Sequence, residues 1–332
     1  MRRTLAARHD RFALRTPFRI SRGVKTAADV VTVTICQGGT QGWGEGVPYP
    51  RYGETVEGAI AEVERVRALI EEGATRADIL QAMPASAARN AVDCALWDLE
   101  ARLAGTSVAA LAGVAPADAI ASAITIGIDT PEAMARAAGD VAQVPLLKIK
   151  VDRDGAAAQI AAVRAVAPAP RLIVDPNESW RVEDIADRLP LLREHRVDLL
   201  EQPVPAGEDQ GLAALAGAIP ICADEALHTR ADLDRLAGLY SHVNVKLDKT
   251  GGLTEALALA EAAQARGFGL MVGCMVCSSL GIAPAMLVAR EAAFVDLDGP
   301  LWLAEDRPGG ARDANGILTA PAPGFWGSAG CA

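Results

Sequence analysis

Apolar and polar side chains change their spacing along this chain of 332 residues. Residues 1–36 alternate apolar and polar positions, which is typical of β-strands. Two stretches with apolar residues at helical spacing follow, Thr55–Glu72 and Ser86–Leu103, and the second begins with a serine suited to N-cap a helix. Strands followed by helices, without alternation, predict a separate α+β domain that extends to about residue 115.

From residue 119 onward, strand patterns and helix patterns alternate strictly. Ser122–Ile128 predicts the first strand, and each later strand is followed by an Ala/Leu-rich helix pattern such as Leu253–Arg266. Gly269–Cys274 and Ala293–Asp298 predict strands seven and eight. The fold class is therefore α/β: a (β/α)7β TIM-like barrel over residues 116–304, capped by an α+β domain of residues 1–115 with the tail from about 305 to 332.

Strands two to six of this predicted barrel each end in one chargeable residue. They are LLKIK ending at Lys150, RLIVD at Asp175, DLLE at Glu201, IPICAD at Asp224 and HVNVK at Lys246. The intervals between these residues are 25, 26, 23 and 22 positions, close to the ~30 residues of one βα unit in a barrel of ~250 residues. Any α/β protein has occasional charges at strand ends, but five in register predict an active site at the barrel mouth.

Three of these residues are carboxylates on consecutive strands. Asp175, Glu201 and Asp224 can converge on one point, where uncompensated negative charges would repel strongly. A divalent cation relieves that repulsion, and an all-oxygen ligand set favours Mg²⁺ or Mn²⁺ over zinc. The sequence therefore predicts a metal site formed by these three residues.

Two lysines lie on strands four apart in a ring of eight. We expect Lys150 and Lys246 to face each other across the mouth, with the metal to one side between them. A neutral lysine can take an α-proton and a protonated lysine can return one on the opposite face, which is a 1,1-proton transfer, while the metal stabilises an enolate. Lys148 shares the face of Lys150 by strand alternation; it is either part of the site or a structural ion-pair partner.

The eighth strand ends in a pair of acids. Asp296 and Asp298 share one face and lie opposite Glu201 in the ring. Two carboxylates there suit an ammonium group held away from the metal, as in a short zwitterion such as a dipeptide. The alternative is that they cap a turn before Gly299-Pro300.

Composition narrows the class of protein. The chain is 51% hydrophobic and 22% charged, with a net charge of −10, which argues against a nucleic-acid surface. No apolar run reaches the ~20 residues needed to span a membrane, and MRRTLAARHDRF lacks the apolar core of a signal peptide. Six cysteines, including Cys331, in mostly apolar contexts indicate a reducing, cytoplasmic setting. A homo-oligomer is compatible with the sequence, which leaves that state open.

Several conspicuous residues predict structure rather than chemistry. The GxGxG of Gly42, Gly44 and Gly46 lacks the strand-to-helix context of a dinucleotide site and is best explained by tight turns. Cys277 forms a CxxC with Cys274, but no second pair follows at zinc spacing. Four tryptophans are most simply packing residues: Trp43, Trp97, Trp180 and Trp302.

The KIK at Lys148–Lys150, the three-acid ladder and VKLDKTGG at Val245–Gly252 resemble the enolase superfamily, muconate-lactonising subgroup, over essentially the whole chain. The DLDGP that begins at Asp296 resembles the dipeptide epimerases, whose DxD binds the substrate's N-terminal amine. The resemblance implies Mg²⁺-dependent epimerisation of L-Ala-D/L-Glu-type dipeptides at the C-terminal residue, and a role in recycling cell-wall peptides. It further implies that Thr125, Lys148 and Cys274 line the substrate and that Lys25 meets its acidic side chain.

Other reactions on this scaffold remain alternatives. They are cycloisomerisation, o-succinylbenzoate synthesis and N-acylamino acid racemisation. Cycloisomerase and o-succinylbenzoate synthase substrates carry no amine and would leave the DxD without a partner. A non-enzymatic ligand-binding barrel is a further alternative, but it would not need both lysines.

Overall fold

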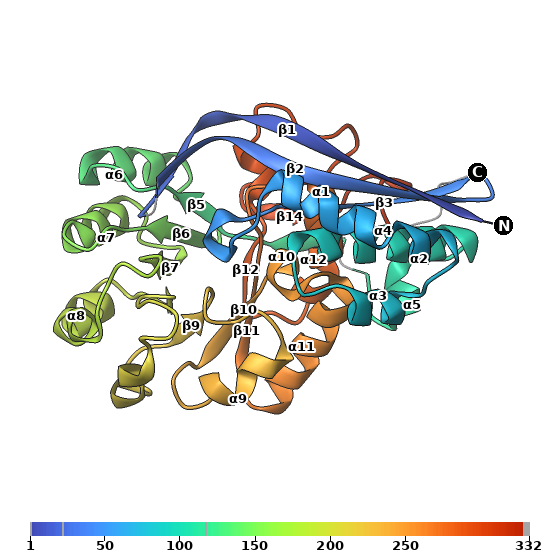
Figure 1. Ribbon diagram of the computed structural model, residues 1–332. Coiled ribbons are helices and arrows are strands. Elements are labelled where there is room, and N and C mark those ends of the chain that lie inside the picture. Colours follow the sequence, from blue (N-terminus) through green and yellow to red (C-terminus); the bar gives the residue numbers. More distant parts are fainter. Residues whose placement is uncertain (1, 22, 117, 328–332) are drawn as a thin grey trace.

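The computed structural model describes residues 2–21, 23–116 and 118–327, so Cys331 lies outside it. Figure 1 shows two parts: a barrel, and an antiparallel sheet whose long β1–β2 hairpin reaches over the barrel. The fold class predicted from the sequence, an α/β barrel with an α+β cap, is confirmed. Among the described helices, none has the length and apolar character needed to cross a bilayer.

The capping sheet has three strands in the order β1-β2-β3. They span Arg3–Ile20, Gly23–Gln37 and Thr40–Gly46. The helices that follow are η1 Pro50–Tyr52, α1 Val56–Arg65, α2 Arg67–Glu71, α3 Arg76–Ala82, α4 Ala87–Leu103 and α5 Val108–Ala112. The Ser86 side chain accepts from Arg89 N, as expected of the N-cap of α4. The single helix expected over Thr55–Glu72 is wrong, because the chain leaves helical geometry at Val66 (φ −96°, ψ 4°).

The GxGxG glycines are not in a turn, which corrects the expectation from sequence. Gly42, Gly44 and Gly46 lie at alternate positions of β3, on the face that packs against α4. A Cβ at Gly44 would lie 2.3 Å from Ala91 O, and one at Gly46 would lie 2.0 Å from Ala87 O. Glycine is needed there because the helix backbone approaches the strand too closely for any side chain.

Eight parallel strands form the barrel in the order β5 to β12. Ala123 N donates to Val295 O at 2.8 Å, which joins the first strand to the last. The strands are β5 Ile124–Ile126, β6 Leu146–Lys150, β7 Arg171–Asp175, β8 Leu199–Glu201, β9 Ile221–Ala223, β10 His242–Val245, β11 Gly269–Gly273 and β12 Phe294–Asp296.

Helices separate these strands, and the short helix η4 follows the last one (Figure 1). They are α6 Pro131–Asp140, α7 Ala156–Val166, α8 Val182–Glu194, η2 Gln210–Leu215, η3 Arg230–Asp232, α9 Leu233–Leu236, α10 Leu247–Thr250, α11 Leu253–Ala265, α12 Ser279–Ala289 and η4 Gly299–Trp302. The expectation of an α-helix after every strand is wrong after β8, where the connection is the short 3₁₀ helix η2. Gly211 and Gly217 in that segment disfavour a longer α-helix.

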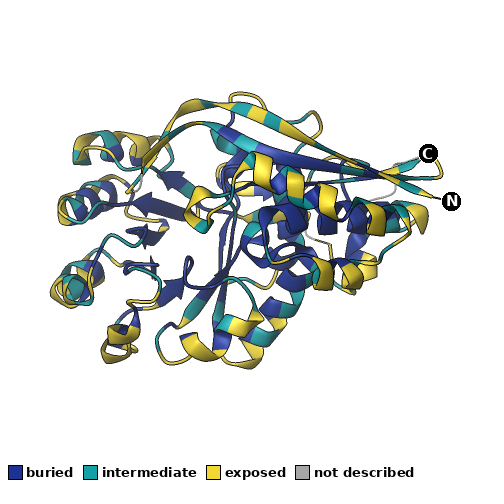
Figure 2. Cartoon of the chain, viewed as in Figure 1, coloured by how far each residue is buried: buried dark blue, intermediate teal, exposed yellow. Residues whose placement is uncertain are grey.

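Apolar side chains fill part of the barrel interior. Figure 2 shows the barrel strands coloured mostly as buried. Every barrel strand except β10, or the residue just before the strand, contributes one side chain to a compact cluster made of Ala123, Leu146, Ile173, Leu199, Cys222, Met271 and Phe294. These residues come from the start or the middle of the strands, whereas the acids of the ladder come from the carboxyl ends. A ligand can therefore reach the interior only at the carboxyl-end mouth.

The C-terminal segment returns to the capping sheet. β13 Arg312–Ala314 and β14 Ile317–Thr319 first pair with β4 Ala119–Ala121 in a second small sheet. Farther on, Trp43 Nε1 donates to Phe325 O at 2.7 Å. The end of the described chain is thus bound to β3.

Helix α4 joins the capping sheet to the barrel. Asp93, fully buried, accepts from Thr254 N at 2.9 Å and from Thr254 Oγ1 at 2.6 Å, at the start of α11. Burial raises the pKa of Asp93 to about 6, against the opposing effect of these two hydrogen bonds. Asp248, half-buried just after β10, accepts from Val47 N at 2.9 Å and from Asn90 Nδ2 at 2.8 Å. The segment after β10 is therefore held by the capping domain.

Candidate active site

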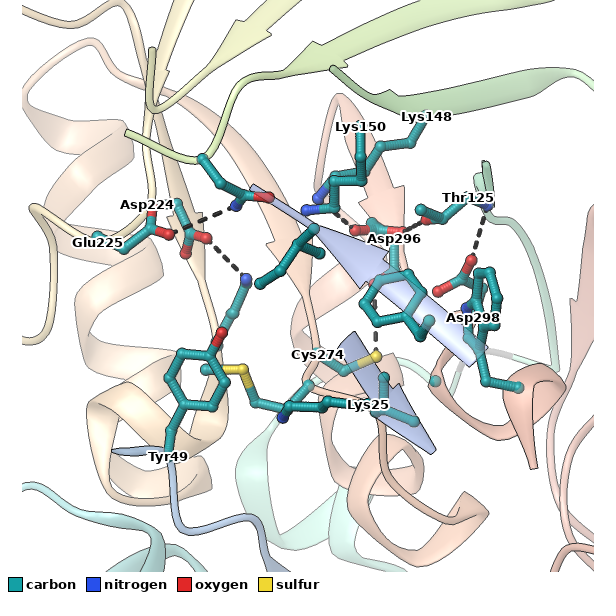
Figure 3. A pocket seen from close by; sticks show the side chains of 18 of the residues that line it. Lys25, Tyr49, Thr125, Lys148, Lys150, Asp224, Glu225, Cys274, Asp296 and Asp298 are labelled. Atoms are coloured by element: carbon teal, nitrogen blue, oxygen red, sulfur yellow. Dashed lines mark hydrogen bonds and ion pairs between the residues drawn. The ribbon is translucent and has the colours of Figure 1, made fainter. Parts of the chain in front are cut away.

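A cavity opens at the carboxyl ends of the barrel strands, beneath the β1–β2 hairpin. Figure 3 shows Asp224 and Glu225 on one side, Thr125, Asp296 and Asp298 on the other, and Lys148 and Lys150 between them. The hairpin and the segment after β3 contribute Phe18, Ile20, Lys25, Tyr49 and Tyr52; the barrel contributes Thr125, Lys148, Lys150, Asn177, Asp224, Glu225, Lys246, Cys274, Met275, Val276, Asp296, Asp298, Gly299 and Trp302.

Strand β6 turns its two lysines into the barrel, because alternate side chains of a strand share a face. Lys148 is 1% exposed, and its Nζ lies 2.6 Å from Glu201 Oε2, 2.7 Å from Asp296 Oδ2 and 3.2 Å from Asp175 Oδ2. Burial opposes its charge, but the surrounding carboxylates outweigh that effect and raise the pKa of Lys148. Lys148 is therefore a fixed ammonium at the centre of the site, in contact with three acids.

The three carboxylates of the predicted metal site are buried at neighbouring strand ends. Asp175 and Glu201 are fully buried and Asp224 is 2% exposed. Burial opposes ionisation of Asp175, but the charges of Lys150 and Lys148 overcome it and lower its pKa to about 2. Burial, then the charge of Asp175, raises the pKa of Glu201 to about 7. Glu201 therefore holds its proton more tightly than Asp175 does.

The donor chemistry of this group fits a hard divalent cation. Glu201 Oε2 is buried and accepts no hydrogen bond of good geometry from the described residues, although Lys148 Nζ is close. Within the described part of the chain, no three His, Cys, Asp or Glu side chains are arranged around a common point at which a metal ion could bind. Ammonium groups lie among the carboxylates instead, and they supply the positive charge that a cation would supply.

The second lysine of the predicted pair follows β10. Lys246 Nζ lies 2.8 Å from Asp224 Oδ2, whereas Lys150 forms an ion pair with Asp175. Burial opposes the charge of Lys246, but Asp224 outweighs that effect and raises the pKa of Lys246. Their strands, β6 and β10, are four positions apart in the ring of eight, and the lysines pair with the two end members of the acid ladder.

A further lysine beside the acid ladder, Lys249, is one of the main contacts of the site. Lys249 is 1% exposed, and its Nζ donates to Asp224 Oδ1 at 2.7 Å and to Asn244 O at 2.9 Å. Burial is the main cause that lowers the pKa of Lys249. Asp224 therefore lies between two ammonium groups. Burial opposes its ionisation, but the charges of Lys246 and Lys249 outweigh that effect and hold the pKa of Asp224 well below the usual range.

Two amides that sequence analysis missed hold the acids in place. Asn244 Nδ2 donates to Glu201 Oε1 at 2.9 Å, and Gln202 Oε1 accepts from Asp224 N at 2.8 Å. Asn244 was detectable, because it lies two positions before Lys246 in HVNVK and so shares its face. Gln202 was not, because it follows the strand at a positive φ of 30° that the sequence does not reveal.

The DxD pair faces into the cavity beside Thr125. Thr125 Oγ1 donates to Asp296 Oδ1 at 3.2 Å, and Thr125 N donates to Asp298 Oδ2 at 2.7 Å. Asp298 occupies the N-cap position of η4, yet its side chain makes no capping bond there, so the turn-capping alternative is not supported. Burial, then the neighbouring charge of Asp296, raises the pKa of Asp298 to about 7.

The capping domain covers the other side of the cavity. Lys25 Nζ lies 4.6 Å from the centroid of the Tyr49 ring, and both residues line the cavity (Figure 3). Arg51 binds Glu178 through two hydrogen bonds of 2.9 Å, which fastens the segment after β3 to the loop after β7. Tyr49 was not predicted as a site residue, because it enters the cavity from the capping domain rather than from a barrel strand.

Two residues on the β11 and β12 side complete the wall. Cys274 is half-buried, and its thiol donates to Asp296 O at 3.6 Å. Trp302 lines the cavity, so its interpretation as a packing residue alone is wrong. No local pattern separates it from the other tryptophans, because its position follows from the η4 turn after Asp298.

Comparison with known proteins places both parts of the chain in one family. Residues 2–113 match the mandelate racemase/muconate lactonizing enzyme N-terminal domain, and residues 131–325 match the enolase C-terminal domain-like family. The chain is 47% identical over 306 residues to L-Ala-D/L-Glu epimerase of Escherichia coli (strain K12), covering 92% of this chain and 95% of that protein. It is 42% identical over 305 residues to N-acetyl-D-glutamate racemase of a Pseudoalteromonas species, covering 90% and 96%.

Solved structures agree with this grouping. An enolase family member of Agrobacterium tumefaciens with homology to dipeptide epimerases, with bound sodium and L-Ala-L-Glu, superposes with a TM-score of 0.95 at 48% identity, covering 98% of this chain and all of that chain. The dipeptide epimerase of Cytophaga hutchinsonii, complexed with Mg and D-Ala-L-Val, gives a TM-score of 0.90 at 28% identity, covering 99% and 95%. The chain therefore belongs to the mandelate racemase/muconate lactonizing enzyme family of the enolase superfamily, and it is an isomerase.

Proposed function

We propose that this protein is a Mg²⁺-dependent dipeptide epimerase that inverts the α-carbon of the C-terminal residue in dipeptides of the L-Ala-D/L-Glu type. The observation that carries the proposal is the charge layout of the cavity. Asp224 lines the cavity, while Asp175 and Glu201 are buried at the neighbouring strand ends. Lys150 and Lys246 pair with the two end members of this ladder, and two further acids lie next to Thr125. Substrates with an amine at one end and a carboxylate near the other match this layout.

Each end of such a dipeptide has a complementary partner. The carboxylates of Asp296 and Asp298 accept hydrogen bonds from the N-terminal ammonium. This pairing leaves fewer buried charges uncompensated than binding of an uncharged ligand would. Lys25 meets the acidic side chain of the C-terminal residue, although a lysine cannot make the two-pronged contact of an arginine. Thr125, Lys148 and Cys274 line the bound chain.

Asp175, Glu201 and Asp224 would hold the cation, which supplies stabilisation of negative charge on the substrate carboxylate as the α-proton leaves. Lys150 and Lys246 exchange the proton at opposite faces of the α-carbon. Lys246, whose Nζ lies 2.8 Å from Asp224 Oδ2, suits the acid in one direction. Lys150 then acts as the base at the other face, and the roles reverse for the other epimer.

N-acylamino acid racemisation is the second candidate, because one relative at 42% identity is an N-acetyl-D-glutamate racemase. An N-acyl substrate has no ammonium group at that end. Lys148 already contacts Asp296 at 2.7 Å, but Asp298 has no lysine or arginine among its described ion pairs. A ligand amine would complete the charge balance there, which favours the dipeptide.

Incubation in D₂O with Mg²⁺ tests the proposal, with α-deuterium followed by NMR. We expect incorporation at the C-terminal α-carbon of L-Ala-L-Glu and L-Ala-D-Glu, and much less for N-acetylglutamate. Chelation of the metal should stop the exchange, and Mg²⁺ should raise the melting temperature of the metal-free protein, since a ligand of the native state stabilises it. Exchange into N-acetylglutamate alone would select the second candidate.

Two lysine variants test the mechanism in the same assay. We expect Lys150→Ala and Lys246→Ala each to abolish inversion, because each removes the base for one epimer and the acid for the other. Each variant can still exchange the α-proton of the one epimer that its remaining lysine reaches. Near-normal inversion in both directions by either variant would disprove the two-base scheme.

We also propose the domain boundaries suggested by the sequence. Residues 1–115, joined by the tail from about 305, form the capping domain, and 116–304 form the catalytic barrel. The contact of Trp43 with Phe325 supports the assignment of the tail.

A further inference from the structure

Trp302 stands between the active-site cavity and a second, largely apolar groove. It ends η4, four residues after Asp298, and it is half-buried. The groove lies between the capping hairpin and the β5–α6 unit, and its volume is about 490 Å³. Trp302 and Thr125 line both spaces. The apolar residues of the groove include Ile124, Ile126, Ile128, Met134 and Val141.

The indole is held in place by the hairpin. The centroids of the Trp302 and Phe18 rings lie 4.4 Å apart with an interplanar angle of 57°. Directly after Trp302, Ala304 N donates to Ala13 O at 2.8 Å, and Arg15 Nε donates to Leu303 O at 2.7 Å. Both rings pack against a small cluster formed around the fully buried Leu303. The partition is therefore a packed wall rather than a loose side chain.

We propose that Trp302 limits the size of the side chain on the N-terminal residue of the substrate, with Phe18 as its support. This inference rests on the proposed function. If the DxD pair holds the N-terminal ammonium, the side chain of that residue leaves the adjacent carbon, close to the turn that joins Asp298 to Trp302. A short side chain such as that of alanine fits in front of the indole.

The neighbouring part of the wall has no spare room. A methyl group at Gly299 would lie 2.6 Å from Met275 O and 3.0 Å from Cys274 Sγ. A longer side chain must therefore displace Trp302, which its contacts with the hairpin oppose. Removal of the indole joins the cavity to the apolar groove, where a leucine or phenylalanine side chain can be buried.

The test measures kcat/KM of the full-length enzyme with Mg²⁺ for L-Ala-L-Glu, L-Leu-L-Glu and L-Phe-L-Glu, by α-deuterium incorporation. One methylene in an apolar pocket changes specificity by ~10–200-fold. We expect wild type to prefer alanine over leucine by at least ~100-fold. Trp302→Ala should raise the Leu/Ala ratio by at least ~100-fold, with a loss of less than about tenfold on L-Ala-L-Glu, and Trp302→Leu should give a smaller rise.

Phe12→Ala is the matched control. Phe12 packs on the same Leu303 cluster but lines neither the cavity nor the groove. It should lower the melting temperature and leave the Leu/Ala ratio unchanged, which separates loosening of the cluster from opening of the partition.

The outcomes distinguish the two proposals. An unchanged ratio in Trp302 variants that still turn over L-Ala-L-Glu overturns the role of Trp302 and leaves the proposed function intact, as does a wild type that accepts leucine as well as alanine. A wild type that turns over no dipeptide overturns both. If Trp302→Ala does not fold, the Leu/Ala ratios of Trp302→Leu and Trp302→Phe provide the same test. The ratio is expected to rise as the side chain at this position becomes smaller.

Discussion

A buried ion pair between the C-terminal segment and β3 should contribute strongly to stability. Arg307 Nη2 lies 2.8 Å from Glu45 Oε2 and 2.7 Å from Thr32 Oγ1, and Arg307 Nε lies 2.7 Å from Ser278 Oγ. The Glu45 side chain is fully buried and that of Arg307 is 9% exposed. Burial opposes the charge of Arg307, but Glu45 outweighs it and raises the pKa of Arg307.

Arg307→Met should therefore lower the free energy of unfolding by about 3–5 kcal/mol, because it leaves the Glu45 carboxylate buried without a counter-charge. Glu45 retains only the Ser278 N–H, at 2.8 Å, and the Ser278 hydroxyl as donors. The double variant Glu45→Gln/Arg307→Met removes both charges, so its cost should be smaller than the sum of the two single variants by about 1–3 kcal/mol.

Equilibrium urea unfolding, followed by both circular dichroism and tryptophan fluorescence, measures these differences, and coincident curves justify a two-state treatment. Arg8→Met is the matched control. Arg8 pairs with Asp10 at 2.9 Å, as Arg307 does at 3.1 Å, but the Arg8 side chain is 55% exposed, so its loss should cost less than about 1 kcal/mol. Equal costs for Arg8→Met and Arg307→Met, or additive costs in the double variant, would refute the reasoning.

Two further substitutions test other contacts. Gly44→Ala should destabilise the protein by at least ~3 kcal/mol, because the new Cβ would lie 2.3 Å from Ala91 O. Gly139→Ala in α6, where a Cβ would have no atom within 4 Å, should stabilise it by about 0.5–1 kcal/mol. Changes of the same sign for both variants in urea unfolding would contradict this reasoning. Burial raises the Asp93 pKa from 3.8 to about 6, so unfolding releases a proton between these values and stability falls as pH rises through them. Asp93→Asn, which keeps a pair of hydrogen bonds to Thr254, should lack this fall of about 3 kcal/mol. Parallel curves of stability against pH for wild type and variant would exclude Asp93 as the cause of the fall.

The strand ends of the barrel follow from local patterns. Each of Lys150, Asp175, Glu201, Asp224 and Lys246 ends a short apolar run, and parallel strands bring their carboxyl ends to one edge. A period of two then fixes which side chains enter the barrel, so the positions of the lysines and acids required no knowledge of distant contacts.

The interpretation of glycines and aromatics failed where the partner was distant in sequence. Gly44 was taken for a turn residue because nothing nearby in the chain reveals that α4 packs onto β3. Tyr49 enters the cavity from the capping domain rather than from a barrel strand. Trp302 faces Phe18 because β1 runs beside the segment after η4.

The sequence by itself determined the barrel, the order of its strands and which charged residues lie at its mouth, since these depend on short-range spacing. Only the tertiary structure decided what encloses the mouth and which side chains neutralise each other, such as Lys148 among Asp175, Glu201 and Asp296. Those properties depend on distances between side chains from separate strands and from the capping hairpin. Such distances are fixed by packing across the whole molecule, for which a local pattern carries no signal.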